Sequence, residues 1–314
     1  MIKVQKIRCI TVTVCDLTQA QNFYTQALGF KRVGETTFTD SSYNQLTSTS
    51  SSSVQLVTLQ LGDELIELIQ YLDLKAEPLP KDSQSNDLWF QHLAIVVSDM
   101  DLAYEHLKSF DIEYISNQPQ TIPEDNKMAP GVRAFKFRDP IDRQSLELIW
   151  FPEGIGKEKW QRKTDEIFLG IDHSAISVAD TEESLTFYRD LLGMTVEGGN
   201  LNSGEVQAHL DGLPVAEVQV TPLQPIETSV GVELLDYIKP GTGRHVPQNW
   251  QANDLAHLHF ILEVDDLEQS VKQLQQHKVE MVSPGIVKLP NVYRYRNGCL
   301  IRDPNGHALL LASE

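Results

Sequence analysis

The sequence is poor in cysteine, in positive charge and in long apolar runs. Its three cysteines, an odd number without a CxxC pair, exclude a disulfide framework and predict a reducing, cytoplasmic location. No run of about 18 apolar residues occurs, and the cationic N-terminus lacks the apolar stretch of a signal peptide, so neither a membrane span nor secretion is expected. Lys and Arg number 26 against 44 Asp and Glu, and the resulting charge of −18 disfavours nucleic acid and anionic membranes as partners.

Sequence motifs of nucleotide-binding proteins and serine hydrolases are also missing, because neither a P-loop nor a G-x-G-x-x-G or G-x-S-x-G pattern occurs. What remains is a composition typical of globular proteins, with 41% hydrophobic and 22% charged residues. A length of 314 residues favours two domains of about 150 residues each.

The dominant feature of the chain is an internal repeat. The stretch DLTQAQNFYTQALGF, which begins at Asp16, returns 164 residues later as DTEESLTFYRDLLGM, which begins at Asp180. The pair Asn86-Asp87 returns 167 residues later as Asn253-Asp254. A fainter repeat of 83 to 86 residues lies inside each half, so the chain divides into four related modules.

The modules cover residues 1–75, 88–152, 168–240 and 253–314. Each begins with an alternating strand, continues with an Asp that can cap a helix and an amphipathic helix, and ends with further strands. This pattern predicts an α+β fold of four βαβββ modules. The charged, turn-rich stretch 152–167 separates a domain at 1–157 from a domain at 165–314. We therefore expect the first two modules to form one domain and the last two modules to form the other. The Ser/Thr-rich segment 40–53 is expected to be a mobile loop.

Each of the four opening strands has an equivalent position on its less apolar face. This position is occupied, in chain order, by Cys9, His92, His173 and His259. Because alternate residues of a strand point to opposite faces, the apolar partners such as Ile10 pack under the helix and the variable face lines a cavity.

The closing strands of the first three modules place Glu67, Glu147 and Glu233 within apolar runs. A buried carboxylate must be neutralised, paired or bound to a metal, since an isolated buried charge is costly. Imidazole and carboxylate groups on neighbouring strands are ligands that divalent transition metals take. The recurrence of three His and three Glu at matching positions therefore predicts a metal site in at least one half.

With these residues identified, the chain resembles the vicinal oxygen chelate superfamily, which contains glyoxalase I, extradiol dioxygenases and bleomycin-resistance proteins. The resemblance covers nearly the whole chain and rests on the pattern D-x(6)-F-Y-x(3)-L-G at 16–29 and 180–193 and on the RDP turns at 138–140 and 302–304. It implies two domains in which paired modules close an incomplete barrel around one metal, with ligands from the first and last strands of each module. It also implies Fe²⁺, Mn²⁺, Zn²⁺ or Ni²⁺ as cofactor and a small oxygen-chelating substrate as partner.

The resemblance implies one set of ligands in each half. The C-terminal half offers His173, Glu233 and His259, with Leu310 where a fourth ligand would lie. The N-terminal half offers Glu67, His92 and Glu147, with Cys9 in the first-strand position. Glyoxalase I sites use four ligands, two of them Glu, and neither half alone supplies that set.

Two further residues are candidates for catalysis. His257 lies two residues before His259 on the same strand face, where it could exchange protons, and Tyr295 could line the cavity of the C-terminal half. The favoured function is a metal-dependent enzyme, either a dioxygenase or a glyoxalase-like lyase or isomerase. The alternatives are a metal-free protein that sequesters a small molecule, as bleomycin-resistance proteins do, and an enzyme with one active and one structural half. A monomer and a homodimer are both compatible with the repeat.

Overall fold

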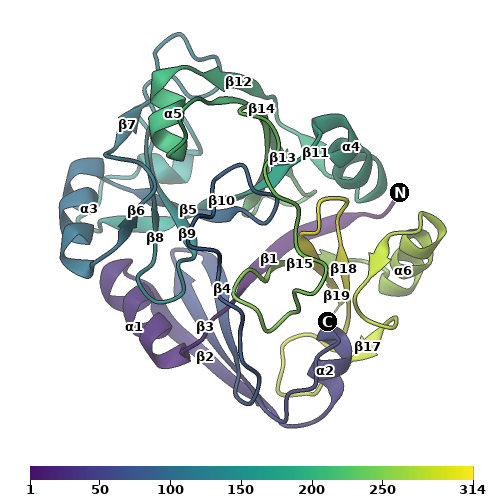
Figure 1. The fold of residues 1–314 in the computed structure, drawn as a ribbon. Helices are drawn as coiled ribbons and strands as arrows, with labels where there is room; N and C mark the ends of the chain where they lie inside the picture. The colour runs from purple at the N-terminus through teal and green to yellow at the C-terminus, as the bar shows by residue number, and fades with distance from the viewer. Residues whose placement is uncertain (314) are drawn as a thin grey trace.

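The computed structural model of the protein describes residues 1–313, and in this range two open mixed sheets carry the four modules (Figure 1). Strands pair in an unbroken order across each sheet, and neither order closes on itself. The predicted α+β fold is therefore confirmed. In the same range no helix is long and apolar enough to cross a membrane.

Sheet I contains nine strands from the two ends of the chain. From module 1 (1–75) come β1 (Val4–Thr13), β2 (Lys31–Phe38), β3 (Val54–Leu61) and β4 (Glu64–Tyr71). From module 4 (253–314) come β15 (Leu258–Val264), β16 (Glu280–Met281), β17 (Val287–Lys288), β18 (Asn297–Arg302) and β19 (Ala308–Ser313).

Sheet II contains ten strands from the middle of the chain. From module 2 (88–152) come β5 (Gln91–Val97), β6 (Glu113–Tyr114), β7 (Gln120–Thr121), β8 (Arg133–Arg138) and β9 (Ser145–Trp150). From module 3 (168–240) come β10 (Phe168–Val178), β11 (Thr195–Val196), β12 (Asn200–Ser203), β13 (Glu217–Gln224) and β14 (Gly231–Lys239).

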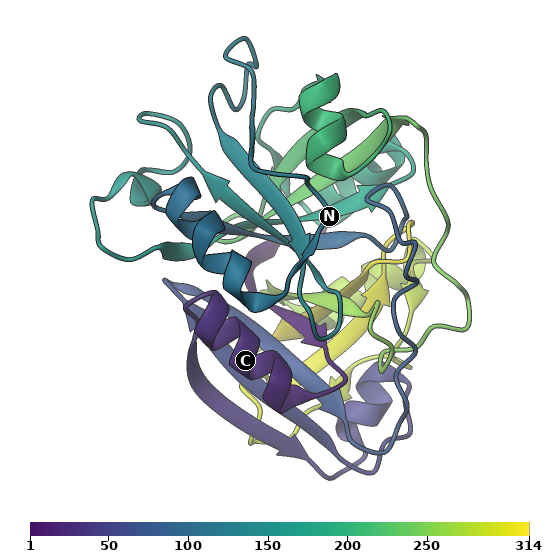
Figure 2. The ribbon, with the colours of Figure 1, turned by 60° about the vertical axis from the view of Figure 1, so that its left-hand side comes forward.

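The modules thus pair differently from the expected order. The opening strand β1 runs antiparallel to β15, and β5 runs antiparallel to β10, so module 1 joins module 4 and module 2 joins module 3. Figure 2 shows this arrangement, with the purple and yellow ends of the chain in one layer and the blue to green middle in the other. The expectation that module 1 pairs with module 2, and module 3 with module 4, is wrong, because the first strands meet across the two halves. The chain division between 157 and 165 stays a prediction.

Each module has one helix that follows its opening strand. These are α1 (Leu17–Ala27), α3 (Met100–Leu107, extended by η1, Lys108–Phe110), α4 (Thr181–Leu185, extended by the π-helical turn η3, Thr186–Leu191) and α6 (Leu267–Gln276). The predicted Asp caps are confirmed in all four, since the carboxylates of Asp16, Asp99, Asp180 and Asp266 accept hydrogen bonds from backbone N–H groups of the first turn.

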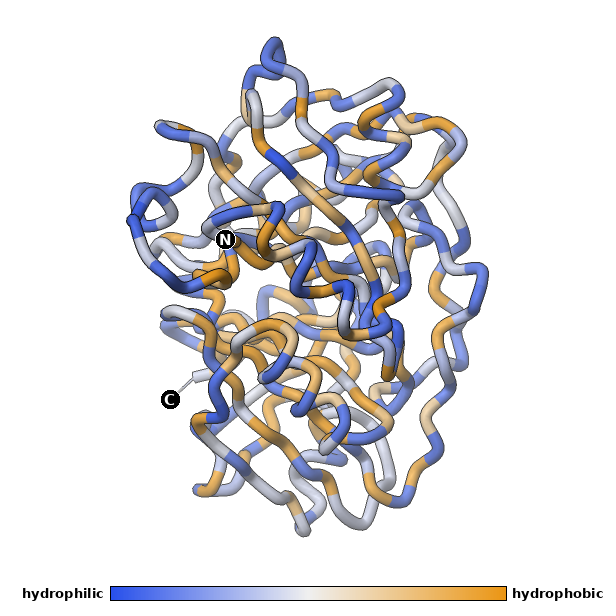
Figure 3. The backbone as a smooth tube through the Cα atoms, turned by 90° about the vertical axis from the view of Figure 1, so that its left-hand side faces the viewer, coloured by the Kyte–Doolittle hydropathy of each residue, from blue (hydrophilic) through white to orange (hydrophobic). Residues whose placement is uncertain are grey.

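The largest core forms between these helices and one face of each sheet. Ile10 and Val12 of β1, and Leu93 and Ile95 of β5, belong to it together with Tyr24 of α1, as the strand alternation predicted. In Figure 3 the hydrophobic segments of the backbone lie mostly in the interior and the hydrophilic ones mostly at the outer loops. The other face of each sheet is left for separate clusters and for a cavity.

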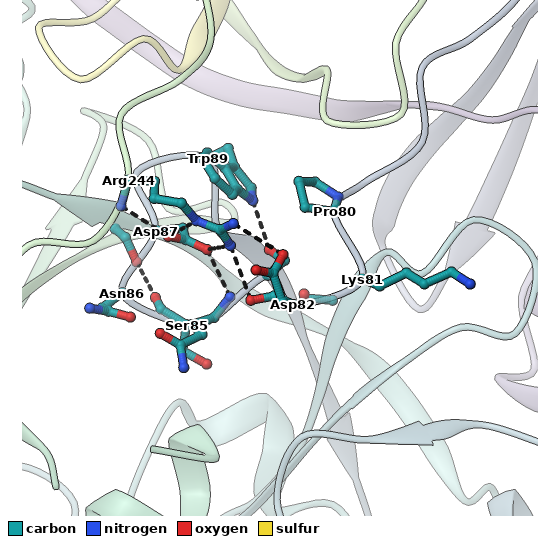
Figure 4. A network of polar contacts seen from close by, with 12 residues as sticks. Pro80, Lys81, Asp82, Ser85, Asn86, Asp87, Trp89 and Arg244 are labelled. Carbon is teal, nitrogen blue, oxygen red and sulfur yellow. Dashed lines mark hydrogen bonds and ion pairs between the residues drawn. The ribbon is translucent and has the colours of Figure 1, made fainter. Parts of the chain in front are cut away.

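Two connectors hold the sheets together, and the repeated Asn-Asp pair explains how. Arg244, from the connector between modules 3 and 4, donates to both carboxylate oxygens of Asp87 at 3.0 and 2.7 Å and lies 4.7 Å from the ring centre of Trp89 (Figure 4). In the symmetric place, Asp254 accepts from the backbone N–H of Glu77 in the connector between modules 1 and 2. Each Asn-Asp pair therefore anchors the opposite connector.

Modules 1 and 3 each contain a second, shorter helix at an equivalent place. The segment expected to be a mobile loop contains α2 (Ser42–Thr47), whose Tyr43, Leu46 and Thr47 are buried against sheet I, so that expectation is wrong. Module 3 has a helix at the same place in its own repeat, α5 (Glu205–Asp211), between β12 and β13. The charged stretch between the halves forms the 3-10 turn η2 (Glu158–Gln161) and buries Trp160.

Candidate metal centre

Strand register brings two His and two Glu together in sheet II. His92 of β5 and Glu233 of β14 lie on either side of Ala175, because β10 pairs with both strands at that residue. His173 of β10 and Glu147 of β9 lie on either side of Ala94 in the same way. Two residues from each half of the chain therefore meet around the junction of the two first strands.

The distances between the four side chains are short. His92 Nε2 lies 3.0 Å from Glu147 Oε2, and His173 Nε2 lies 3.7 Å from the same oxygen. His173 Nε2 also lies 3.3 Å from Glu233 Oε2, so the four groups form one continuous cluster. Ligand atoms of His92, Glu147 and His173 all fall within 4.8 Å of one another, a separation that a single ion can bridge.

The cluster is buried and strongly polarised. Burial lowers the pKa of His92 to about 4, with the charge of Glu147 opposing this effect. Burial disfavours charge on Glu147 as well, yet His92, Lys136 and His173 outweigh it and lower the pKa of that carboxyl to about 2. Burial raises the pKa of Glu233, whose side chain is 25% exposed, whereas the other three are 2 to 6% exposed.

The residues present fit a divalent cation. His92 Nδ1 is buried and, among residues 1–313, has no hydrogen-bond partner, while Nε2 faces Glu147 Oε2 at 3.0 Å. Buried polar atoms without a partner are rare in proteins, and each needs an explanation such as a bound ion. Two imidazoles and two carboxylates are a donor set that Zn²⁺, Ni²⁺, Fe²⁺ and Mn²⁺ all accept.

A carboxylate next in sequence supports one of the candidate ligands. The pairing of β10 with β5 shifts register between Ile171 and His173, and such a bulge re-aims neighbouring side chains. Asp172 Oδ2 lies 3.1 Å from His173 Nδ1, the nitrogen on the side of the ring away from Glu233. Asp172 is itself held by the indole N–H of Trp160 at 2.7 Å and by Lys157 at 3.2 Å. The stretch between the halves therefore contributes to the site.

A cavity of about 410 Å³ opens on the cluster, and His92, Glu147, His173 and Glu233 all line it. Apolar side chains and uncharged amides from modules 2 and 3 form much of the remaining lining. Lys136 of β8 also lines it, in register with Glu147, and forms an ion pair of 2.6 Å with Asp211 of α5. Sequence reasoning did not select Lys136 or Asp172 as site residues.

Sheet I repeats the geometry with only two of the four ligand residues. Glu67 and His259 lie on either side of Thr11, as Glu233 and His92 do around Ala175, but Cys9 and Leu310 take the other two places. Glu67 accepts hydrogen bonds from Tyr293 at 2.8 Å and from Thr11 at 3.2 Å, which satisfies its carboxylate.

The remaining predicted residues also lie on the sheet I side. His257 Nε2 contacts His259 Nδ1 at 3.1 Å, and burial lowers the pKa of both imidazoles. Tyr295 is 2% exposed and belongs with Tyr43 to the aromatic cluster that fills this face. His257, His259, Glu67 and Tyr295 are thus not brought to the cavity of sheet II.

The expected grouping by halves is therefore corrected to a grouping by sheet. A signal for this was present in the sequence, because modules 2 and 3 each keep both a first-strand His and a last-strand Glu. Module 1 replaces the His with Cys9, and module 4 replaces the Glu with Leu310. The two intact modules are the ones that pair.

A family model described as the Glyoxalase/Bleomycin resistance protein/Dioxygenase superfamily matches residues 6–148 and, a second time, residues 170–311. The chain belongs to this superfamily. A 2-epi-5-epi-valiolone epimerase from an Actinomyces species is 32% identical over an alignment of 157 residues that covers 48% of this chain and 81% of that protein.

Solved structures of this superfamily share the fold. Glyoxalase I from Zea mays superposes with a TM-score of 0.65 at 16% identity, over 98% of this chain and 92% of that one. A putative dioxygenase from Bacillus subtilis subsp. subtilis str. 168 gives a TM-score of 0.61 at 14% identity, over 99% of this chain and 86% of that one. At these identities the likeness concerns the fold alone.

Proposed function

We propose that this protein is a metal-dependent enzyme that moves a proton on the carbon next to a carbonyl group of a small oxygen-chelating substrate, as a glyoxalase-like isomerase or an epimerase. The observation that carries the proposal is the meeting of two imidazoles and two carboxylates, drawn from both halves of the chain, beside one cavity. His92, Glu147, His173 and Glu233 would hold the ion. A bound divalent ion would polarise the substrate carbonyl and stabilise the negative charge that develops on it.

Glu233 is the residue we assign to proton transfer. Its side chain is the most exposed of the four at 25%, and burial with the nearby charge of Glu147 raises its pKa, so it holds a proton more readily than Glu147 does. Glu147 lies close to both imidazoles and its pKa is lowered, as suits a permanent ligand. A carboxylate whose pKa is raised toward the working pH is the better general base.

The second carboxylate favours proton transfer over oxygen activation. Iron sites that activate dioxygen typically use two His and a single carboxylate, whereas the cluster in sheet II offers two of each. The Actinomyces relative is named an epimerase, which agrees with stereochemical inversion by way of a carbon acid. The alternative is a metal-free protein that sequesters a small molecule, and the presence of metal separates the two.

The test is the metal content per chain of the wild type and of two matched variants. His173→Ala removes a proposed ligand, while His259→Ala removes a buried imidazole from β15, the opening strand of module 4 in sheet I. We expect about one equivalent in the wild type and in His259→Ala and a loss of metal in His173→Ala. Glu67→Gln, which also alters sheet I alone, provides a second control in case His259→Ala folds poorly. A wild type that stays empty after reconstitution would support the metal-free alternative.

The role of Glu233 has a separate readout. In D₂O, the enzyme should exchange the hydrogen next to the carbonyl of a small 2-hydroxyketone substrate, and Glu233→Gln should abolish the exchange. Wild-type exchange that survives in Glu233→Gln would assign the base to another residue.

A further inference from the structure

The lining of the cavity in sheet II is rich in uncharged amides. The carboxamide side chains that line it are those of Asn126, Asn200, Asn202, Gln207 and Gln224. A carboxamide both donates and accepts hydrogen bonds, as a hydroxyl group does, and carries no charge. The three Asn side chains are hydrogen-bonded within the protein, whereas Gln207 and Gln224 each have a buried oxygen that a purely apolar ligand would leave unsatisfied.

Gln207 of α5 is oriented by a buried ion pair. Lys136 Nζ donates to Asp211 Oδ1 at 2.6 Å, and Gln207 Nε2 donates to Asp211 Oδ2 at 2.7 Å. With its nitrogen committed to Asp211, Gln207 is left with a buried carboxamide oxygen that has no partner among residues 1–313, and Gln224 has a buried oxygen in the same condition. A buried acceptor without a donor is unfavourable, so a hydroxyl group supplied by a ligand would be stabilising.

Sheet I contains an internal comparison for this helix. The helix α2 occupies the place in module 1 that α5 occupies in module 3, and it buries Tyr43, Leu46 and Thr47. These residues belong to or adjoin an aromatic cluster that fills the corresponding face of sheet I. A helix in this position can therefore pack with apolar residues, and the buried Gln207 and Asp211 of α5 are not required by the architecture.

The charges around the cavity argue for a neutral substrate. Its two lysines are already paired, Lys136 with Asp211 at 2.6 Å and Lys157 with Asp172 at 3.2 Å, and no arginine lines it within the described range. Glu147, Glu197 and Glu233 add negative charge to the lining. A carboxylate or phosphate on the substrate would find no unpaired cation other than the proposed metal ion.

We infer that the site takes a neutral, polyhydroxylated carbonyl compound of monosaccharide size, and that Gln207 selects it by accepting a hydrogen bond from a substrate hydroxyl group. This inference rests on the proposed function, because it concerns the same cavity. The volume of about 410 Å³ lies in the usual range of small-molecule sites, at its lower end.

The experiment is calorimetric titration of the metal-loaded protein with named probes. The polyhydroxylated probes are 2-keto-myo-inositol, D-fructose and dihydroxyacetone. The comparison probes are 2-hydroxycyclohexanone, which keeps two adjacent oxygens, and the anionic 2-oxoglutarate. We expect at least one polyhydroxylated probe to bind at least tenfold more tightly than either comparison probe.

Variants assign the selectivity to a residue. Gln207→Met keeps the length of the side chain and removes its amide, and it should weaken the best polyhydroxylated probe about tenfold while leaving 2-hydroxycyclohexanone unchanged. Gln269→Met, on the exposed surface of α6, is the matched control and should change neither. Gln224→Met repeats the test at the second unpartnered oxygen if Gln207→Met folds poorly.

The outcomes separate the two proposals, because metal content is measured on the same samples. Loaded protein that binds hydroxylated and parent probes equally, or that prefers 2-oxoglutarate, would overturn the substrate class alone. Selectivity that survives in both Gln variants would overturn the role of Gln207. Protein that cannot be loaded would overturn the proposed function.

Discussion

The ion pair beneath the cavity offers a direct test of how this site is supported. Lys136 is 3% exposed and Asp211 is 1% exposed, and each has the other as its counter-ion at 2.6 Å. Lys136→Met keeps the aliphatic volume but leaves Asp211 charged and unpaired in the interior. Removing one partner of a buried pair costs about 3–5 kcal/mol, since the desolvated charge that remains is uncompensated.

The expected change in melting temperature follows from the size of the protein. An unfolding entropy of about 2.1 cal/mol/K per residue gives roughly 0.7 kcal/mol/K for a chain of 314 residues that unfolds as one unit. A loss of about 3–5 kcal/mol then lowers the Tm by about 5–8 °C. Differential scanning calorimetry of the metal-free protein would measure it.

Two further variants make the result decisive. Lys108→Met breaks the exposed pair with Glu105, which solvent screens, and should leave the Tm almost unchanged. Lys136→Met combined with Asp211→Asn removes the stranded charge and should recover about 2 kcal/mol of the loss. If Lys136→Met lowers the Tm no more than Lys108→Met does, the ion pair is not a supporting element and the reasoning about the site is wrong.

Three other predictions concern the site and its counterpart. Asp172→Asn should weaken metal binding about 10- to 100-fold in a competition titration with a chromophoric chelator, because the carboxylate orients His173. Asp165→Asn, at an exposed residue, should leave the metal affinity unchanged. Equal metal affinities of the two variants would make Asp172 merely structural. Burial raises the pKa of Glu67 above 4.5, so its neutral form stabilises the protein at pH 4 and this stability is lost as the pH rises. Glu67→Gln should therefore raise the Tm at pH 8 and not at pH 4. An equal change in Tm at both pH values would contradict this direction. Tyr43→Ala should cost about 3–5 kcal/mol in urea unfolding without loss of metal, because Tyr43 stacks on Phe38 in sheet I at 4.5 Å; metal loss on this substitution would place the site in the wrong sheet.

Much of this fold follows from local sequence patterns. The repeat predicts four related modules, strand alternation predicts which face of β1 and β5 meets the helices, and Asp16 and its three equivalents predict where the helices begin. These features depend on interactions between residues close in sequence, such as a carboxylate and the N–H groups of the next turn. Local sequence also predicted the types of residue in the site, since a Glu within an apolar strand needs a partner wherever the strand lies.

The partners themselves were decided by tertiary structure. Each opening strand carries the same alternating pattern, so its apolar face is buried whether module 1 joins module 2 or module 4. The choice is made by long-range pairing of β5 with β10 and of β1 with β15, and it determines that His92 meets His173 and not Glu67. The same pairing leaves Cys9 and Leu310 together in a face closed by aromatic residues. Sequence alone thus specified which groups could bind a metal, and the folded chain selected which of them share one cavity.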